Sequence, residues 1–397
     1  MGSGRCCFLK KRCVINIFQV FKASWALSSE GIFKKDPWFI ITGSKIIDRG
    51  FGKPPKEFFC KSLPDGVVVP GFVNAHSHLE LSAMKGKTTR NQKITGFAKE
   101  IMKLRSELEW KDVTRASANE LEYAYSRGTF YYNDICNNIR FLEYLRSAKY
   151  FNGNRFFEML GFSEPRDDET IQDAQKILDS DRNVFISPHS CYGSSPKILS
   201  FVREYARLTT LTIHLLESAE ESGLPFQKGG IYHFLKEIGS YKLYPEMFHK
   251  NILNYLYEMG MLSFKKLFLI HLVHAQKTEM EYLNNLIPHA AWVLCMRSNE
   301  FIGEIRQNWN LMEKTPLRLL IGTDSTASSP DVSILDEMLA IYKAGYFSEK
   351  QLLRAATFSA YEYMEIPLSR VPFFFFPGAS ASLESLASIK KAFVLRG

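Results

Sequence analysis

The chain has 397 residues, of which 46% are hydrophobic and 23% are charged. These fractions are typical of a globular protein and exclude a disordered or fibrous chain. The formal net charge is +8, from 50 Lys and Arg against 42 Asp and Glu, and no block of five or six basic residues marks a nucleic-acid arm. The length predicts one large domain and a second, small domain. We expect no nucleic acid as a binding partner.

The N-terminal region and the cysteines bear on location. Residues 1–13 contain Lys10, Lys11 and Arg12 and are expected to be a leader or a tag-like segment, without a convincing cleavage site. No apolar run approaches the roughly 20 residues that a membrane helix needs, so no membrane partner is expected. The seven cysteines are odd in number and form no CxxC pair. They favour a reducing, cytoplasmic setting.

The two ends of the chain are predicted to form a small β domain from residues 14–62 and 365–397. Strand-like runs at 38–41 and 45–48 are joined by Gly43, and the chain ends with another at 392–395. Because neither end is long enough to bury a core by itself, we expect the two ends to combine in a β-sandwich-like domain.

Residues 63–364 are predicted to form a distorted (β/α)8 barrel, giving the chain an α/β fold. Segments with helical periodicity, such as 95–109 and 113–127, alternate with short β-rich runs. Eight such runs are present: 67–74, 128–134, 155–161, 183–187, 211–215, 267–272, 292–295 and 318–323. A doubly wound open sheet is the alternative, but no GxGxxG or P-loop follows the first run.

The most informative motif is His76-Ser-His78, at the end of the first predicted barrel strand. Two side chains at i and i+2 on a strand point to the same face, so both imidazoles can reach one metal ion. A hydrogen-bonded pair of histidines in a turn is the competing interpretation.

Three later polar features also follow predicted strands. His214 closes the fifth strand and is followed by Glu217, His271 closes the sixth, and Asp324 closes the eighth. Each has an ordinary structural interpretation by itself, as a core histidine, a carboxylate at a helix N-terminus or an N-cap. Together they favour one site, because active sites of these barrels lie at the carboxyl ends of the strands. Burying these groups without a metal or partners would cost several kcal/mol.

These motifs, in this order, resemble the amidohydrolase superfamily. Within it, the chain is similar to the branch that contains purine, adenosine-type and S-adenosylhomocysteine deaminases and the chlorohydrolase-like enzymes. The resemblance rests on residues 70–80, 187–190, 214–221, 295–299 and 321–325. It implies an aminohydrolase, a hydrolase acting on C–N bonds. The implied metal ligands are His76, His78, His214 and Asp324, and the implied catalytic groups are Glu217, His271 and Asp324.

The resemblance also bears on the cofactor and on substrate contacts. Two-metal members carry a bridging Lys in the fourth strand, and residues 184–189 contain none, which implies one divalent ion. Three His and one Asp suit Zn²⁺, with Fe²⁺ as the alternative. His189, Glu80 and Ser325 are expected to contact the substrate, with a solvated loop carboxylate as the other interpretation of Glu80. His274 is expected to lie outside the site.

The expected substrate is a small nucleoside. Residues 78–97 and 214–234 are similar to 6-aminodeoxyfutalosine deaminases, which act in the futalosine route to menaquinone. The departures are Gly96-Phe97-Ala98 in place of a Trp-containing segment, Cys191, and an insertion-like stretch at 240–254. Deaminases of S-adenosylhomocysteine, methylthioadenosine or adenosine, and other chlorohydrolase-like enzymes, are alternatives. A degenerate metal-binding protein without activity is the alternative outside this class, and homo-oligomerisation is left open.

Overall fold

The computed structural model describes residues 19–43, 45–55, 60–181, 183–206, 209–243, 250–305, 315 and 317–396. The predicted leader at residues 1–13 lies outside the described residues. Within the described residues, no helix combines the length and the apolar character needed to cross a bilayer.

Eight parallel strands form a distorted (β/α)8 barrel, as predicted. Two four-stranded sheets build it, in the orders β11-β10-β9-β8 and β12-β13-β14-β15. A single bridge between Ser77 and Asp324 joins β8 to the segment after β15. The first four strands are β8 (Phe72–Ser77), β9 (Thr129–Cys136), β10 (Gly153–Met159) and β11 (Val184–Pro188), and the others are β12 (Thr210–Leu215), β13 (Lys266–His271), β14 (Ala291–Leu294) and β15 (Arg318–Ile321).

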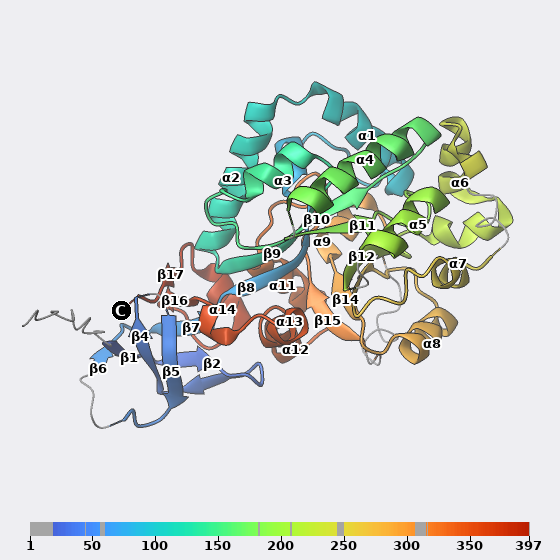
Figure 1. The fold of residues 1–397 in the computed structure, drawn as a ribbon. Coiled ribbons are helices and arrows are strands. Elements are labelled where there is room, and N and C mark those ends of the chain that lie inside the picture. The colour runs from blue at the N-terminus through green and yellow to red at the C-terminus, as the bar shows by residue number, and fades with distance from the viewer. Residues whose placement is uncertain are drawn as a thin grey trace, which may run out of the picture.

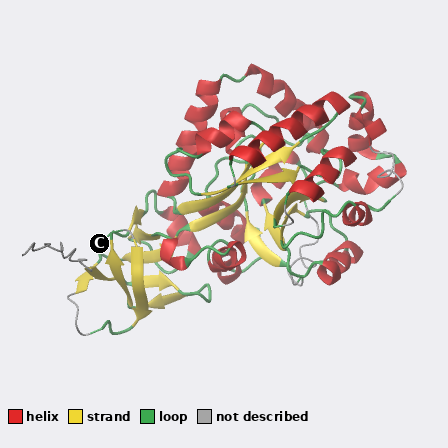
Figure 2. Ribbon diagram, in the orientation of Figure 1, coloured by secondary structure: helices red, strands yellow, loops and turns green. Residues whose placement is uncertain are grey.

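Helices surround the strands (Figures 1 and 2). Several begin at a serine that caps them, such as Ser163 before α4 and Ser195 before α5, each followed by a proline in the first turn. The longer helices are α1 (Lys93–Glu107), α2 (Trp110–Ser126), α4 (Glu164–Ser180), α5 (Pro196–Tyr205), α6 (Gly229–Glu237), α8 (Lys277–Leu286) and α11 (Ile334–Lys343). The shorter ones are η1 (Leu79–Met84), α3 (Ile139–Leu145), η2 (Ala219–Phe226), η3 (Ser240–Leu243), α7 (Ile252–Glu258), α9 (Met296–Ile302), α12 (Glu349–Ala355), α13 (Phe358–Met364), η5 (Leu368–Arg370) and α14 (Leu383–Ser388).

Two further sheets lie at one side of the barrel and contain strands from both ends of the chain (Figure 1). Their orders are β5-β4-β1-β6 and β17-β16-β7-β2-β3. The strands are β1 (Gln19–Lys22), β2 (Trp25–Leu27), β3 (Phe33–Lys35), β4 (Pro37–Thr42), β5 (Lys45–Phe51), β6 (Cys60–Ser62), β7 (Gly66–Pro70), β16 (Phe373–Pro377) and β17 (Phe393–Val394). A separate core that includes Phe21, Phe39 and Phe375 is buried in this region.

The prediction of one barrel strand over residues 67–74 is wrong. The run is two strands, because β7 pairs with β2 and β16, and only β8 pairs with β9. Gly71 separates them at a close approach: a Cβ there would lie 2.6 Å from Cβ of Phe130. The predicted boundary between the small β domain and the barrel, at residues 62/63, stays a proposal. It assigns β7 to the barrel, although β7 pairs within the sheet that contains the chain termini.

Candidate active site

His76 and His78 project from the end of β8, and a buried carboxylate holds the backbone around them. Asp134 Oδ1, on β9, accepts hydrogen bonds from Ser77 Oγ at 2.8 Å and from the Leu79 N–H at 2.9 Å. Burial raises the pKa of Asp134 to about 7, although these two hydrogen bonds oppose the rise. The two imidazole rings lie edge to face, with centroids 4.8 Å apart.

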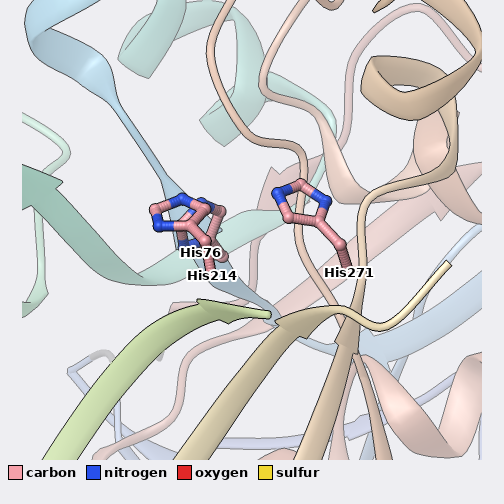
Figure 3. Close-up of side chains that lie close together, drawn as sticks. All are labelled: His76, His214 and His271. Carbon is pink, nitrogen blue, oxygen red and sulfur yellow. The ribbon is translucent and has the colours of Figure 1, made fainter. Parts of the chain in front are cut away.

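His214 and His271 come from the neighbouring strands β12 and β13. His214 Nδ1 donates to the His189 carbonyl at 2.9 Å, and His271 Nδ1 lies 3.2 Å from Oδ1 of Asn299. Since both acceptors are oxygens without a proton, each Nδ1 carries the hydrogen and each Nε2 keeps its lone pair. Figure 3 shows the rings of His76, His214 and His271 close together; the His76 ring centroid is 4.9 Å from that of His214 and 6.0 Å from that of His271.

Asp324 brings a carboxylate to the same place from the segment after β15. Its Oδ1 lies 3.6 Å from Nε2 of His78 and 3.9 Å from Nε2 of His76. The other oxygen, Oδ2, accepts hydrogen bonds from Ser298 and Ser328. These two hydroxyls orient the carboxylate, so that Oδ1 faces the histidines.

The donor set fits a divalent metal ion. Both ring nitrogens of His76 are buried without a hydrogen-bond partner in the described structure, which is costly unless a ligand fills the position. Burial lowers the pKa of His76 and His214 well below the ordinary value, and neutral imidazoles are the form that binds metal. Ligand atoms of His76, His78 and Asp324 lie within 4.8 Å of one another, and three imidazoles with one carboxylate suit Zn²⁺.

Glu217 lies in the loop after β12, where a second glutamate fixes the backbone. The Glu221 carboxylate accepts the N–H groups of Leu216, Glu217 and Ser218 at 2.7–3.2 Å. Glu217 Oε1 is 3.4 Å from Nε2 of His271. Burial, reinforced by the nearby Asp324 carboxylate, raises the pKa of Glu217 well above its ordinary value. A buried acid thus faces a histidine nitrogen that can accept a proton.

These groups line a cavity with a largely apolar wall. Beside the proposed metal ligands and Glu217, it is bordered by residues of α1, α6 and the segments after β10, β11 and β15. The apolar and aromatic side chains in the wall are Leu81, Ile94, Phe97, Ala98, Ile101, Met102, Leu160, Phe162, Tyr192 and Phe234. Such a wall, with a few polar groups at its base, is the usual form of a small-molecule site.

The other predicted residues fall in different places. His189 and Ser325 line the cavity. Glu80 is buried and is absent from the described lining of the cavity: its Oε2 accepts the Asn137 N–H at 3.1 Å, and its Oε1 lies 3.7 Å from Nη2 of Arg105. His274 is paired with Glu304, with Nε2 2.9 Å from Oε2 of Glu304, and is absent from the described lining of the cavity.

Two charged residues in the cavity were missed from the sequence, Glu158 and Arg105. Glu158 lies in β10, inside an apolar run, and that position was the available signal. Arg105 lies on α1 among other charged residues, where no pattern distinguishes it from a solvated helix face.

Comparison with known proteins identifies the family. The amidohydrolase family model matches residues 67–371, which is most of the chain. The chain belongs to the amidohydrolase family. This membership confirms the predicted enzyme class, a hydrolase acting on carbon–nitrogen bonds.

Relatives of this amidohydrolase are named as deaminases, the class of enzyme that its motifs predict. It is 25% identical over 317 residues to 5-methylthioadenosine/S-adenosylhomocysteine deaminase of Pyrococcus abyssi, covering 75% of this chain and 68% of the relative. It is 24% identical over 292 residues to aminodeoxyfutalosine deaminase of Deinococcus radiodurans, covering 68% and 67%. For another 5-methylthioadenosine/S-adenosylhomocysteine deaminase, from Thermoanaerobacter pseudethanolicus, the matched residues make up only 60% of the relative's length.

A solved structure supports the fold over almost the whole chain. Aminofutalosine deaminase of Helicobacter pylori, crystallised with methylthio-coformycin, is similar with a TM-score of 0.78 at 18% identity. The match covers 95% of this chain and 98% of that structure. The predicted fold class, a distorted barrel with a sheet domain formed by the chain termini, is confirmed.

Proposed function

We propose that this amidohydrolase deaminates a 6-aminopurine nucleoside by hydrolysis, with aminodeoxyfutalosine of the futalosine route to menaquinone as the substrate. The observation that carries the proposal is the Glu217–His271 pair. An acid with a raised pKa and a neutral imidazole face each other at 3.4 Å, at the base of a cavity with an aromatic wall. Deamination needs both groups, because one proton must reach the base and another must leave the water.

His76, His78, His214 and Asp324 would hold one divalent ion, Zn²⁺ in our proposal and Fe²⁺ in the alternative. When bound, such an ion acts as a Lewis acid that makes water nucleophilic near neutral pH. The tautomers of His214 and His271 leave both Nε2 atoms with a lone pair. The His271 Nε2 atom is therefore free to orient the attacking water.

The proton transfers follow from the positions of three side chains. Glu217 donates its proton to ring nitrogen N1 while water attacks C6, so that negative charge does not accumulate on the ring. The Asp324 carboxylate, oriented by the hydroxyls of Ser298 and Ser328, takes the water proton with the help of His271. Asp324 then passes this proton to the amino group, the C–N bond breaks, and ammonia leaves. The remaining hydroxyl proton returns to Glu217 as the C6 carbonyl forms.

The names of the relatives support the substrate class, and they also keep one alternative open. The Deinococcus relative is an aminodeoxyfutalosine deaminase, whereas the Pyrococcus relative acts on 5-methylthioadenosine and S-adenosylhomocysteine. All three of these compounds have a 6-aminopurine attached to a ribose. His189 and Ser325, which line the cavity, are proposed to contact this common part.

Ammonia release by the purified, zinc-loaded enzyme tests the proposal. The panel contains aminodeoxyfutalosine, S-adenosylhomocysteine, 5-methylthioadenosine, adenosine and guanine. We expect the highest kcat/KM for aminodeoxyfutalosine. A higher value for another nucleoside would change the substrate but keep the reaction. Activity on guanine alone, or on none of the five, would refute the proposed function.

A further inference from the structure

The Glu158 carboxylate is a charged group in the cavity that the proposed reaction does not use. Glu158 is 3% exposed and projects from the end of β10. Its Oε1 is buried and has no hydrogen-bond partner within the described residues. A buried acceptor of this kind is costly to leave unpaired. Since Glu158 lines the cavity, a ligand in the cavity can supply the missing donor.

A structural ion pair does not account for Glu158. Within the described residues, Oε1 of Glu158 lies 3.7 Å from Nδ1 of His214. That nitrogen already donates its hydrogen to the His189 carbonyl at 2.9 Å. The carboxylate and the ring are therefore neighbours without a hydrogen bond between them.

The position of Glu158 in the barrel determines which part of a bound nucleoside can contact its carboxylate. Strand β11 separates β10 from β12. Glu158 and His189 therefore come from the ends of β10 and β11 on one side of the barrel. Glu217 and His271 come from the ends of β12 and β13, on the adjacent side. The purine N1 and C6 must face Glu217, His271 and Asp324. The sugar then extends from the opposite edge of the base. Apart from the amino group that leaves, an adenosine-type nucleoside has only its sugar hydroxyls as donors.

We propose that Glu158 accepts hydrogen bonds from the vicinal hydroxyls of the substrate ribose and thereby selects ribonucleosides over deoxyribonucleosides. This inference rests on the proposed nucleoside deamination. A carboxylate has two acceptor oxygens and can receive two adjacent hydroxyls at once. Sites built to bind a hydroxyl discriminate strongly against the analogue that lacks it, because the protein group is then left buried and unpaired.

Glu80 does not compete for this role in the structure. Its two oxygens face the Asn137 N–H and the Arg105 guanidinium. Its contribution to substrate binding would act through Arg105, which lines the cavity. Glu80 is therefore a matched control: a buried glutamate near the same cavity whose oxygens already have partners.

The test compares adenosine with 2′,3′-dideoxyadenosine in the zinc-loaded wild type, Glu158→Gln and Glu80→Gln. In the wild type we expect kcat/KM for adenosine to exceed that for the dideoxy compound by at least about 100-fold. Glu158→Gln should lower kcat/KM for adenosine by about 10- to 100-fold, mainly through KM, and leave the dideoxy compound within about threefold. The ratio between the two substrates should stay unchanged in Glu80→Gln.

Two further measurements separate binding from folding and metal content. The dissociation constant of the product inosine, measured by calorimetry, should rise in Glu158→Gln by about the same factor as KM. The zinc content should stay at one equivalent. Because ligand atoms of Glu158, His78 and His214 lie within 4.8 Å of one another, loss of zinc from Glu158→Gln would make Glu158 a metal ligand and overturn the inference.

The remaining outcomes distinguish this inference from the proposed function. If the wild type deaminates both compounds with equal kcat/KM, or if Glu158→Gln keeps the wild-type ratio, the role of Glu158 is wrong and the reaction stands. If the wild type releases ammonia from no nucleoside, both the reaction and this inference fall.

Discussion

Among single residues, Glu217 determines how the enzyme should respond to pH. Its raised pKa comes first from burial and then from neighbouring carboxylates, Asp324 foremost. A general acid works only while it is protonated, and a raised pKa extends that range upward. We therefore expect kcat/KM of the wild type to fall as the pH rises through the pKa of Glu217.

The Glu217→Gln variant tests this assignment. It removes the proton donor without changing the size of the side chain, so turnover should fall by about 10²- to 10⁴-fold and the zinc content should stay the same. The alkaline limb of the wild-type pH profile should be absent from the residual activity. A variant nearly as active as the wild type would assign the acid role to another group.

The histidines offer a matched test of the metal site. We expect about one equivalent of divalent ion per chain, and His214→Ala should lose it because one of four ligands is gone. His274→Ala should retain it, since His274 is paired with Glu304 outside the site. Metal analysis and thermal melts in the presence of a chelator measure both effects, because a ligand that binds only the folded state raises its stability. Full metal content in His214→Ala would contradict the ligand set.

The ease of predicting a residue from sequence depended on its neighbours in the chain. His76 and His78 are two residues apart at the end of one strand, and His214 and Glu217 share one short motif, so their spacing alone suggested a shared site. Glu158 and Arg105 have no such pattern, and only the folded cavity places them together. The same is true of Glu80, whose pairing with Arg105 depends on where α1 packs.

At the level of elements, the ends of the barrel strands hold unusual backbone conformations. His271, Leu272 and Asp324 have positive φ angles of 73°, 53° and 58°, which non-glycine residues seldom adopt and which collect at functional sites. The indole N–H of Trp292 donates to the His271 carbonyl at 2.7 Å. Helix α9 supplies Ser298 to Asp324 and Asn299 to His271. One short helix therefore orients two of the proton-transfer groups.

Gly322, just after β15, is a position where an added side chain would press on a proposed metal ligand. A Cβ there would lie 2.8 Å from Cβ of His76, 2.9 Å from Sγ of Cys295 and 2.9 Å from Val293, closer than real Cβ atoms approach. Gly322→Ala should therefore displace His76, lower the metal affinity, and lower the free energy of unfolding by about 1–3 kcal/mol. Metal titration and denaturant unfolding measure these effects.

Gly239→Ala is the control for that experiment. Gly239 has a positive φ of 77°, and a Cβ there meets no atom within 4 Å. The Gly239→Ala variant should lose a little stability because of backbone strain, and its metal affinity should be normal. Equal metal affinity in both variants would mean that contact with His76 at Gly322 does not position the ligand.

The boundary between β7 and β8 shows why element boundaries were harder to predict than element types. Residues 67–73 contain no polar side chain, and both strands are buried, so hydrophobicity gives no sign of the break. The break depends on the partners that each half finds. β7 pairs with β16, about 300 residues later in the chain, and β8 pairs with β9.

For the whole molecule, β7 and β16 connect the two buried cores. Phe374, Phe376 and Val67 belong to the barrel core, whereas Phe373 and Phe375 belong to the core between the two terminal sheets. Because alternate side chains of a strand point to opposite faces, this sheet is buried on both sides. Burial on both faces explains the continuous run of four phenylalanines, which a strand with one solvent-exposed face would not need.

This shared sheet predicts that the barrel and the terminal sheets unfold together. Phe374→Ala removes a ring from the barrel core, and Phe375→Ala removes one from the terminal core on the same strand; each should cost about 3–5 kcal/mol. If the two cores are coupled through β16, both variants should lower the midpoint of one cooperative transition, and the same midpoint should be seen by calorimetry and by release of the bound metal. If the cores were independent, Phe375→Ala would loosen only the terminal sheets. That variant would then show an early calorimetric transition with metal still bound, an outcome that would contradict the coupling.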